Sequence, residues 1–165
     1  MRLALLACLL AGPMFLAGAA QAQAPGETID VGGWKVHNDR NGDGSQTCVV
    51  MWKFDDDSTV GFGADTNKLT YLIVSEPEAE LTKDQQIQVK YKVDGGKQKI
   101  AKGVATSKVM VVIPIATPDL DFAAFGAGTN LIVEFGGETY EEPLGGSKAA
   151  IMALGQCIGE AVANP

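Results

Sequence analysis

Apolar and polar residues alternate along most of the chain from Ile29 onward, and this period predicts strands rather than helices. In the segment 87–93, apolar residues alternate strictly with polar ones, as in a strand with one buried face and one face in water. The run 108–115 is the most apolar of the set, and its length and β-branched residues favour a strand over a buried helix. Further strands are expected, in chain order, at residues 33–36, 47–54, 59–63, 69–74, 97–101, 130–134 and 138–142.

Two segments depart from this pattern and predict short helices. The stretch 118–125 begins with a proline, carries apolar residues at helical spacing and is followed by a glycine. A second helix is expected from Ser147, because Ala150, Leu154 and Cys157 then share one helical face.

Glycine-bearing turns at 94–96 and 136–137 predict hairpins, since glycine accepts the positive φ that tight hairpin turns need. Hairpins outnumber helical crossovers, so the strands should pair mainly antiparallel. The predicted fold is a mainly β domain, an antiparallel β-sandwich or partly closed barrel, with the C-terminal helix packed on the sheet.

The first 22 residues have the pattern of a signal peptide. Arg2 gives a positive start, an apolar stretch follows, and residues 20–22 supply the small-x-small pattern of a cleavage site. Removal of residues 1–22 would leave a flexible lead-in at 23–28 and a single β-rich domain at 29–162. We therefore expect a periplasmic or secreted protein with no membrane span after cleavage.

The charge of the chain excludes some partners. The sequence has 13 basic and 20 acidic residues, a formal net charge of −7. An acidic chain of this kind is repelled by nucleic acid and by anionic membrane surfaces. We therefore expect no nucleic-acid partner.

Two cysteines, Cys48 and Cys157, follow the predicted leader. In an oxidising compartment they predict one disulfide, which would join a buried strand to the terminal helix. Closing so long a loop stabilises the folded state by about 4–5 kcal/mol in the chain-entropy model. Two buried free thiols are the alternative. A redox-catalytic role is not expected, because the chain has no Cys-x-x-Cys motif after the leader.

Calcium is the one cofactor that the sequence suggests. Asp39, Asn41 and Asp43 match the opening half of a calcium loop, with oxygen ligands at alternate positions before a glycine. The match then fails, because Val50 stands where a bidentate glutamate should be. The acidic segment 55–57 could complete the site if the fold brought it near. Alternatively, these residues only build turns.

The sequence gives less support to other candidate catalytic residues. His37 is the only histidine and is expected to be an ordinary surface residue. The glutamates around Pro77 and those at 138–142 could supply a carboxylate pair for glycosidase chemistry. Their polar surroundings instead favour solvated surface charge.

The order of elements in the C-terminal half resembles a known family. A Val/Ile-rich strand is followed by an Asp-Leu-x-Phe helix, another apolar strand and a small-residue helix; these are residues 109–115, 119–122, 130–134 and 144–154. This order resembles the invasion-associated locus B family of small alphaproteobacterial envelope proteins. The resemblance implies a periplasmic or surface β-rich domain with a role in envelope integrity or host contact. It supplies no catalytic residues.

Three functions are consistent with these features. The first is a non-enzymatic, disulfide-stapled domain that acts by protein–protein contact through exposed loops. Its candidate contact residues are Asn38, Arg40, Asp55, Asp56 and Asp57. The second is a calcium-assisted ligand-binding module using the same loops. The third is a carboxylate-pair hydrolase. The partner protein of the first is not specified by the sequence.

Overall fold

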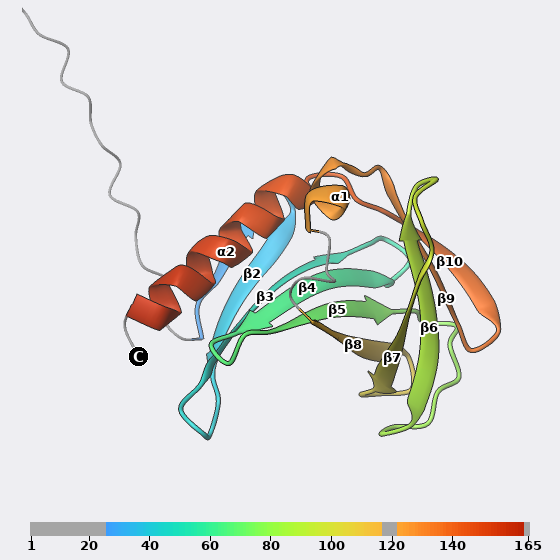
Figure 1. Ribbon diagram of the computed structural model, residues 1–165, viewed down its shortest axis with the longest axis horizontal. Helices are drawn as coiled ribbons and strands as arrows, with labels where there is room; N and C mark the ends of the chain where they lie inside the picture. Colours follow the sequence, from blue (N-terminus) through green and yellow to red (C-terminus); the bar gives the residue numbers. More distant parts are fainter. Residues whose placement is uncertain (1–25, 117–121, 164–165) are drawn as a thin grey trace, which may run out of the picture.

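The computed structural model describes residues 26–116 and 122–163, which form ten strands and two helices (Figure 1). The strands are β1 (Thr28–Val31), β2 (Trp34–Arg40), β3 (Gln46–Lys53), β4 (Thr59–Asp65), β5 (Leu69–Ser75), β6 (Gln86–Val93), β7 (Lys99–Ala105), β8 (Met110–Ala116), β9 (Asn130–Phe135) and β10 (Glu138–Pro143). The helices are α1 (Phe122–Ala127) and α2 (Ser147–Ala163).

All ten strands belong to one antiparallel sheet, in the order β1-β2-β3-β4-β5-β8-β7-β6-β9-β10. The strands at the two ends of this order, β1 and β10, are not paired with each other, so the sheet remains open. The predicted fold class is confirmed, and its form is a single open sheet. Neither helix of the described residues is long and apolar enough to cross a lipid bilayer.

The sheet curls strongly on itself. Strands β2 to β5 and β8 form one arm, and β7, β6, β9 and β10 form a second arm that rises steeply from it (Figure 1). Hydrogen bonds bring the ends of the curl together. The Trp34 indole N–H on β2 donates to the carbonyl oxygen of Gly145, which follows β10, at 2.8 Å. The curl thus encloses a core without a continuous backbone ladder around it.

The core lies inside the curl and is rich in aromatic rings. Trp34 stacks on Phe62 with ring centroids 5.7 Å apart, and Phe62 meets Phe125 of α1 edge-on at 5.0 Å. All three side chains are fully buried. Each such aromatic pair adds about 0.5–1.5 kcal/mol beyond the burial of its area. The short helix α1 therefore serves to insert Phe125 between the two arms.

Helix α2 covers the outer strands β1 to β4. Its buried face carries Ala150, Leu154, Cys157 and Ala161, which follow the spacing of three or four residues expected for one helical face. Cys157 forms a disulfide with Cys48 of β3, with Cα atoms 6.1 Å apart. The predicted disulfide is therefore present, and it fixes the helix to the sheet.

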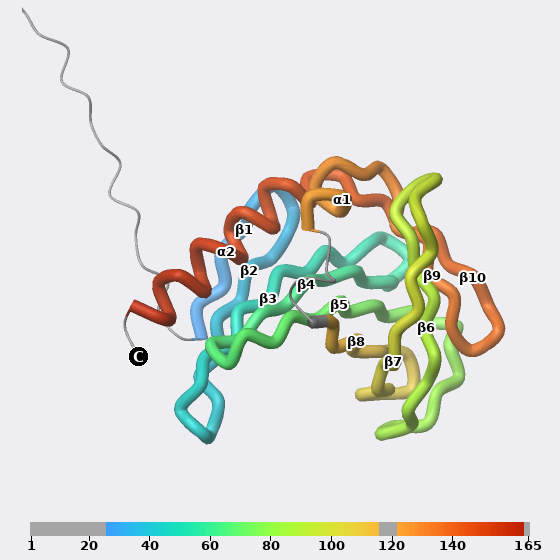
Figure 2. The backbone as a smooth tube through the Cα atoms, in the orientation of Figure 1, coloured from blue at the N-terminus to red at the C-terminus, as the bar shows by residue number. Residues whose placement is uncertain are grey.

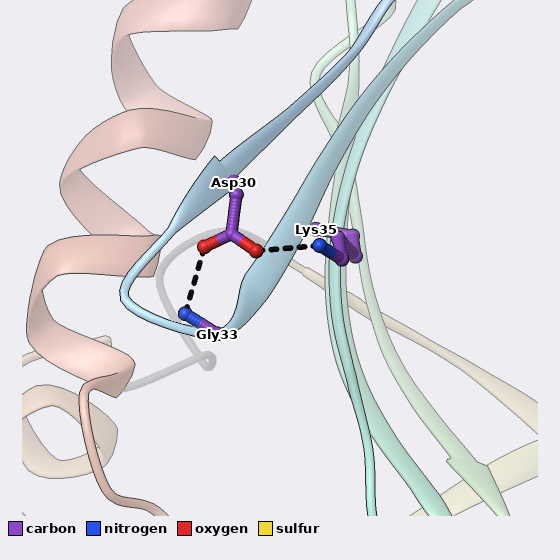
Figure 3. A network of polar contacts seen from close by, with 3 residues as sticks. All are labelled: Asp30, Gly33 and Lys35. Carbon is purple, nitrogen blue, oxygen red and sulfur yellow. Dashed lines mark hydrogen bonds and ion pairs between the residues drawn. The ribbon is translucent and has the colours of Figure 1, made fainter.

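The turn between β1 and β2 is set by one carboxylate (Figure 3). Asp30 accepts a hydrogen bond from the Gly33 N–H at 2.9 Å through one oxygen and pairs with the Lys35 ammonium through the other. The Lys35 hydrogen bond, followed by that of Gly33, lowers the pKa of Asp30. Gly33 has φ +92, and a Cβ at this position would lie 2.8 Å from the Trp52 ring. Both constraints require glycine there.

Several predicted boundaries were wrong. The sequence pattern did not predict β1, and β2 extends through residues 38–40, which were expected to be loop. Strand β7 spans Lys99–Ala105 rather than 97–101. Helix α1 runs to Ala127 and contains the glycine that was expected to end it. The predicted start of that helix at 118–121 and the predicted leader at 1–22 lie outside the described residues.

Candidate functional site

The half-motif for calcium lies at the end of β2 and in the turn that follows. Asp43 accepts hydrogen bonds from the Ser45 N–H at 2.9 Å and from the Ser45 hydroxyl at 2.7 Å, and these bonds lower its pKa. The Asn41 amide donates to the hydroxyls of Ser45 and Thr47. Asp39 lies on β2, with Oδ2 3.1 Å from Nε2 of the half-buried His37. The polar atoms of these side chains therefore form hydrogen bonds or ion pairs within the turn and the strand.

The second acidic segment lies at the other end of β3. Asp56 accepts from the Ser58 N–H at 3.0 Å and from its hydroxyl at 2.7 Å, while Asp57 pairs with Lys53 at 2.6 Å. A strand the length of β3 separates the two segments by roughly 23 Å. The condition under which residues 55–57 could complete the calcium site, namely that the fold brings the two segments together, is therefore not met. Among the described residues, no group of three or more His, Cys, Asp or Glu side chains is arranged to hold a metal ion. Calcium binding by Asp39, Asn41 and Asp43 alone stays a prediction.

The candidate contact residues divide between buried and exposed positions. Asn38 is only 3% exposed on β2, because its side chain faces the sheet interior. It cannot belong to an exposed contact loop, so this assignment was wrong. Arg40, at the end of β2, and Asp55, Asp56 and Asp57, in the β3–β4 turn, are exposed as expected.

Two glutamates expected to be solvated are buried instead. Glu76 follows β5 and is 6% exposed, and Glu142 lies on β10 and is 5% exposed. The Ser58 hydroxyl also lies 3.2 Å from Oε2 of Glu142 and can donate to it in place of Asp56. Oε1 of Glu76 is buried and accepts no hydrogen bond from the described protein donors. These contacts join β10 to the opposite arm of the curl.

Both carboxyl groups have raised pKa values. Burial, the hydrogen bond with Glu142 and the negative charge of Glu142 together raise the pKa of Glu76 to about 8. Burial also raises the pKa of Glu142, although hydrogen bonds from Glu76 and Ser58 oppose the rise. Two ionised carboxylates can only accept hydrogen bonds, so one must be protonated for the pair to form.

This geometry does not suit the glycosidase chemistry considered from the sequence. Retaining and inverting glycosidases hold their carboxyl groups at least about 5 Å apart, with the sugar between them. Glu76 and Glu142 are instead hydrogen-bonded to each other and almost inaccessible. A recess of about 340 Å³ lies beside them, lined also by Asp56, Glu78 and Tyr140. The pair acts as a proton-dependent link between the arms.

An apolar groove runs along one side of α2. Its volume is about 570 Å³, and it separates the helix from the end of β4 and the start of β5. Two of its side chains are strongly exposed, Leu69 at 50% and Val162 at 61%. We call this feature the α2 groove; it is lined by Ala64, Asp65, Thr66, Lys68, Leu69, Thr70, Phe122, Ile151, Leu154, Gly155, Ile158 and Val162.

The sequence analysis missed the α2 groove, although a signal was present. Ile151, Ile158 and Val162 form a second apolar row on α2, beside the buried face. A helix that only packs on a sheet needs one apolar face. The additional row lines the α2 groove.

The fold and these features define a class of protein: a curled, open antiparallel sheet that carries a disulfide-bonded C-terminal helix. No family model matches the sequence, and no curated protein matches it. Among solved structures, the chain is similar to the crystal structure of invasion associated protein B from Bartonella henselae. The two share 17% sequence identity over 79% of this chain and 96% of the other, with a TM-score of 0.52. At this identity the similarity shows a related fold.

Proposed function

We propose that this chain is an exported, non-enzymatic domain that acts by protein–protein contact in the cell envelope or at the host interface. The observation that carries the proposal is the α2 groove, an open groove in which Leu69 and Val162 expose apolar side chains. Contiguous exposed apolar surface of this kind typically marks a protein contact. The partner would present an apolar segment to the groove.

The surroundings of the α2 groove support a contact role. The N–H of Thr66 donates to the carbonyl of Gln46 at 3.0 Å, so the β4–β5 turn at one end of the groove lies against the start of β3. The hairpin that ends at Gln46 projects from the sheet at this end (Figure 1). Arg40 lies on this hairpin and could supply a polar rim contact. The acidic turn 55–57 would form a separate contact.

Two further findings agree with export and contact. The disulfide between Cys48 and Cys157 is typical of proteins in oxidising compartments. The structural neighbour from Bartonella henselae is named as invasion associated, which fits a role at the host interface. Calcium assistance has no structural feature in its favour beyond the half-motif.

Site-specific photocrosslinking in the producing cell tests the proposal. A photoreactive residue at Leu69 should give a discrete crosslinked product in the envelope or secreted fraction. The matched control is Met152, which is 69% exposed on α2 but does not line the groove. Equal crosslinking from both positions, or none from Leu69, would contradict the contact role. The mass of the recovered protein tests export, since cleavage should leave Gln23 as the first residue.

A further inference from the structure

The sheet has an internal opening between β7 and β8. These strands are registered at only two pairs beside their connecting turn, Val104 with Val112 and Ala105 with Val111. Beyond these pairs β8 continues along β5, whereas β7 continues along β6. Figure 2 shows the two strands diverging from the turn into different arms. We call the opening between residues 99–103 and 113–116 the β7–β8 seam.

The direction of the backbone groups along β7 follows from two hydrogen bonds. The Ala105 N–H donates to the carbonyl of Gln85 at 2.9 Å, on the β6 side. The Thr106 N–H donates to the carbonyl of Met110 at 2.9 Å, on the β8 side. Backbone groups of successive strand residues point to opposite edges. The N–H and C=O groups of Ile100 and Lys102 therefore point away from β6 and into the β7–β8 seam.

A proline explains why the ladder stops. If the register of Val104 with Val112 continued, the next hydrogen-bonded pair would join Lys102 to Pro114. Proline has no N–H, so it cannot donate to the Lys102 carbonyl, and prolines in strands are confined to such open edges. The edge of β8 is therefore blocked at Pro114, while the edge of β7 keeps both donors and acceptors. Among the registered strand pairs, β7 has no partner on this side before Val104.

The surface around this edge is basic, although the chain as a whole is acidic. A groove of about 610 Å³ lies along the β7–β8 seam, and Lys97, Lys99 and Lys102 line it. Tyr91 and Ile115 supply an apolar contribution to the same lining. Ile100 is 62% exposed next to Lys102. An open strand edge, a basic rim and an apolar lining therefore coincide at one place.

We infer that the edge of β7 at Ile100 and Lys102 binds an extended, acidic peptide segment of a partner protein by strand addition. Main-chain hydrogen bonds to the two residues give affinity, and alternate side chains give specificity. Side chains of the added strand that face the groove contact Tyr91 and Ile115 and are apolar. Acidic side chains lie among the three lysines. The surface is separate from the α2 groove, so it does not depend on the function proposed there.

The test uses the mature protein and a short synthetic peptide that alternates glutamate with valine. Calorimetry should detect binding, and ¹⁵N-resolved NMR should show its effects concentrated at the amides of Ile100 and Lys102. Two control peptides separate the components of recognition. Proline at the central valine removes strand pairing, and lysine in place of glutamate removes charge complementarity. Each change should weaken binding by about tenfold or more.

Protein variants complete the test. Lys102→Glu should weaken binding of the acidic peptide by about tenfold or more, because it places a negative charge at the edge. Lys83→Glu makes the same charge change at an exposed lysine that does not line the groove and should leave binding unchanged. An unchanged melting temperature shows that Lys102→Glu is folded. The inference is overturned if the acidic peptide does not bind, if the lysine peptide binds equally, or if the amide changes map outside β7.

Discussion

Replacing Glu76 with glutamine should make the protein more stable at neutral pH. Glutamine has almost the same shape as glutamate, and its amide can donate to Glu142 as the shared proton does now. It removes the group that must remain protonated for the buried pair to form. Glu76 is 6% exposed, so solvent screens little of the effect.

The sign follows from the raised pKa. Glu76 has a pKa of about 8 in the folded protein and an ordinary value of 4.5. Below pH 4.5 both states are protonated, and the stabilising contribution of the shared proton is complete. As the pH rises towards 8, the unfolded chain loses the proton before the folded protein does, so the free energy of unfolding falls. One pKa unit corresponds to about 1.4 kcal/mol, so the loss by pH 7 is about 3 kcal/mol.

Urea unfolding at intervals between pH 4 and pH 9 measures this effect. The wild-type free energy of unfolding should fall with pH relative to that of Glu76→Gln, and the two curves should converge near pH 4. Glu78→Gln is the matched control, because it removes a neighbouring but exposed carboxylate and should follow the wild type. Parallel curves for wild type and Glu76→Gln would refute the shared proton.

Two further changes test the packing of the sheet and helix. Replacing Cys48 and Cys157 together with alanine should lower the free energy of unfolding by about 3–5 kcal/mol, and reduction of the wild type should give a similar loss in urea. Gly103→Val should lower the melting temperature, because a Cβ there would lie 2.6 Å from a methyl carbon of Val111 and must displace it. Gly155→Ala should instead stabilise the protein by about 0.5–1 kcal/mol, since no atom lies within 4 Å of the added carbon. A higher melting temperature for Gly103→Val, or a lower stability for Gly155→Ala, would contradict the packing described for these two glycines.

Sequence pattern was sufficient where a strand has one buried and one wet face. The alternation at 87–93 predicted β6, and the apolar run at 108–115 predicted most of β8. Strand β1 escaped notice because three of its four residues are exposed and the fourth is half-buried, so it has no apolar face. The sequence pattern also could not predict that the strands form a single curled sheet. Pro114 marks the point where the β7–β8 ladder opens, but this can be recognised only when the strand register is known.

The candidate sites were less predictable than the strands, because they depend on which residues the fold brings together. Cys48 and Cys157 were identified because two cysteines permit only one pairing. Glu142 reads as surface charge in sequence, and its burial depends on a partner, Glu76, that the curl brings across from the other arm. Asp43 lies at the spacing of a calcium ligand in the sequence. In the structure its carboxylate oxygen accepts local hydrogen bonds from the turn instead, as aspartates in turns commonly do.

The β7–β8 seam is the feature on which the proposed strand-binding surface depends, and amide hydrogen exchange tests it most directly. The amides of Ile100 and Lys102 face the seam and should exchange fast, whereas those of Ala101 and Gly103 are directed towards β6 and should be protected. This alternation from residue to residue is the predicted result. Uniform protection from residue 100 to residue 103 would show that the seam is closed and would contradict the open edge.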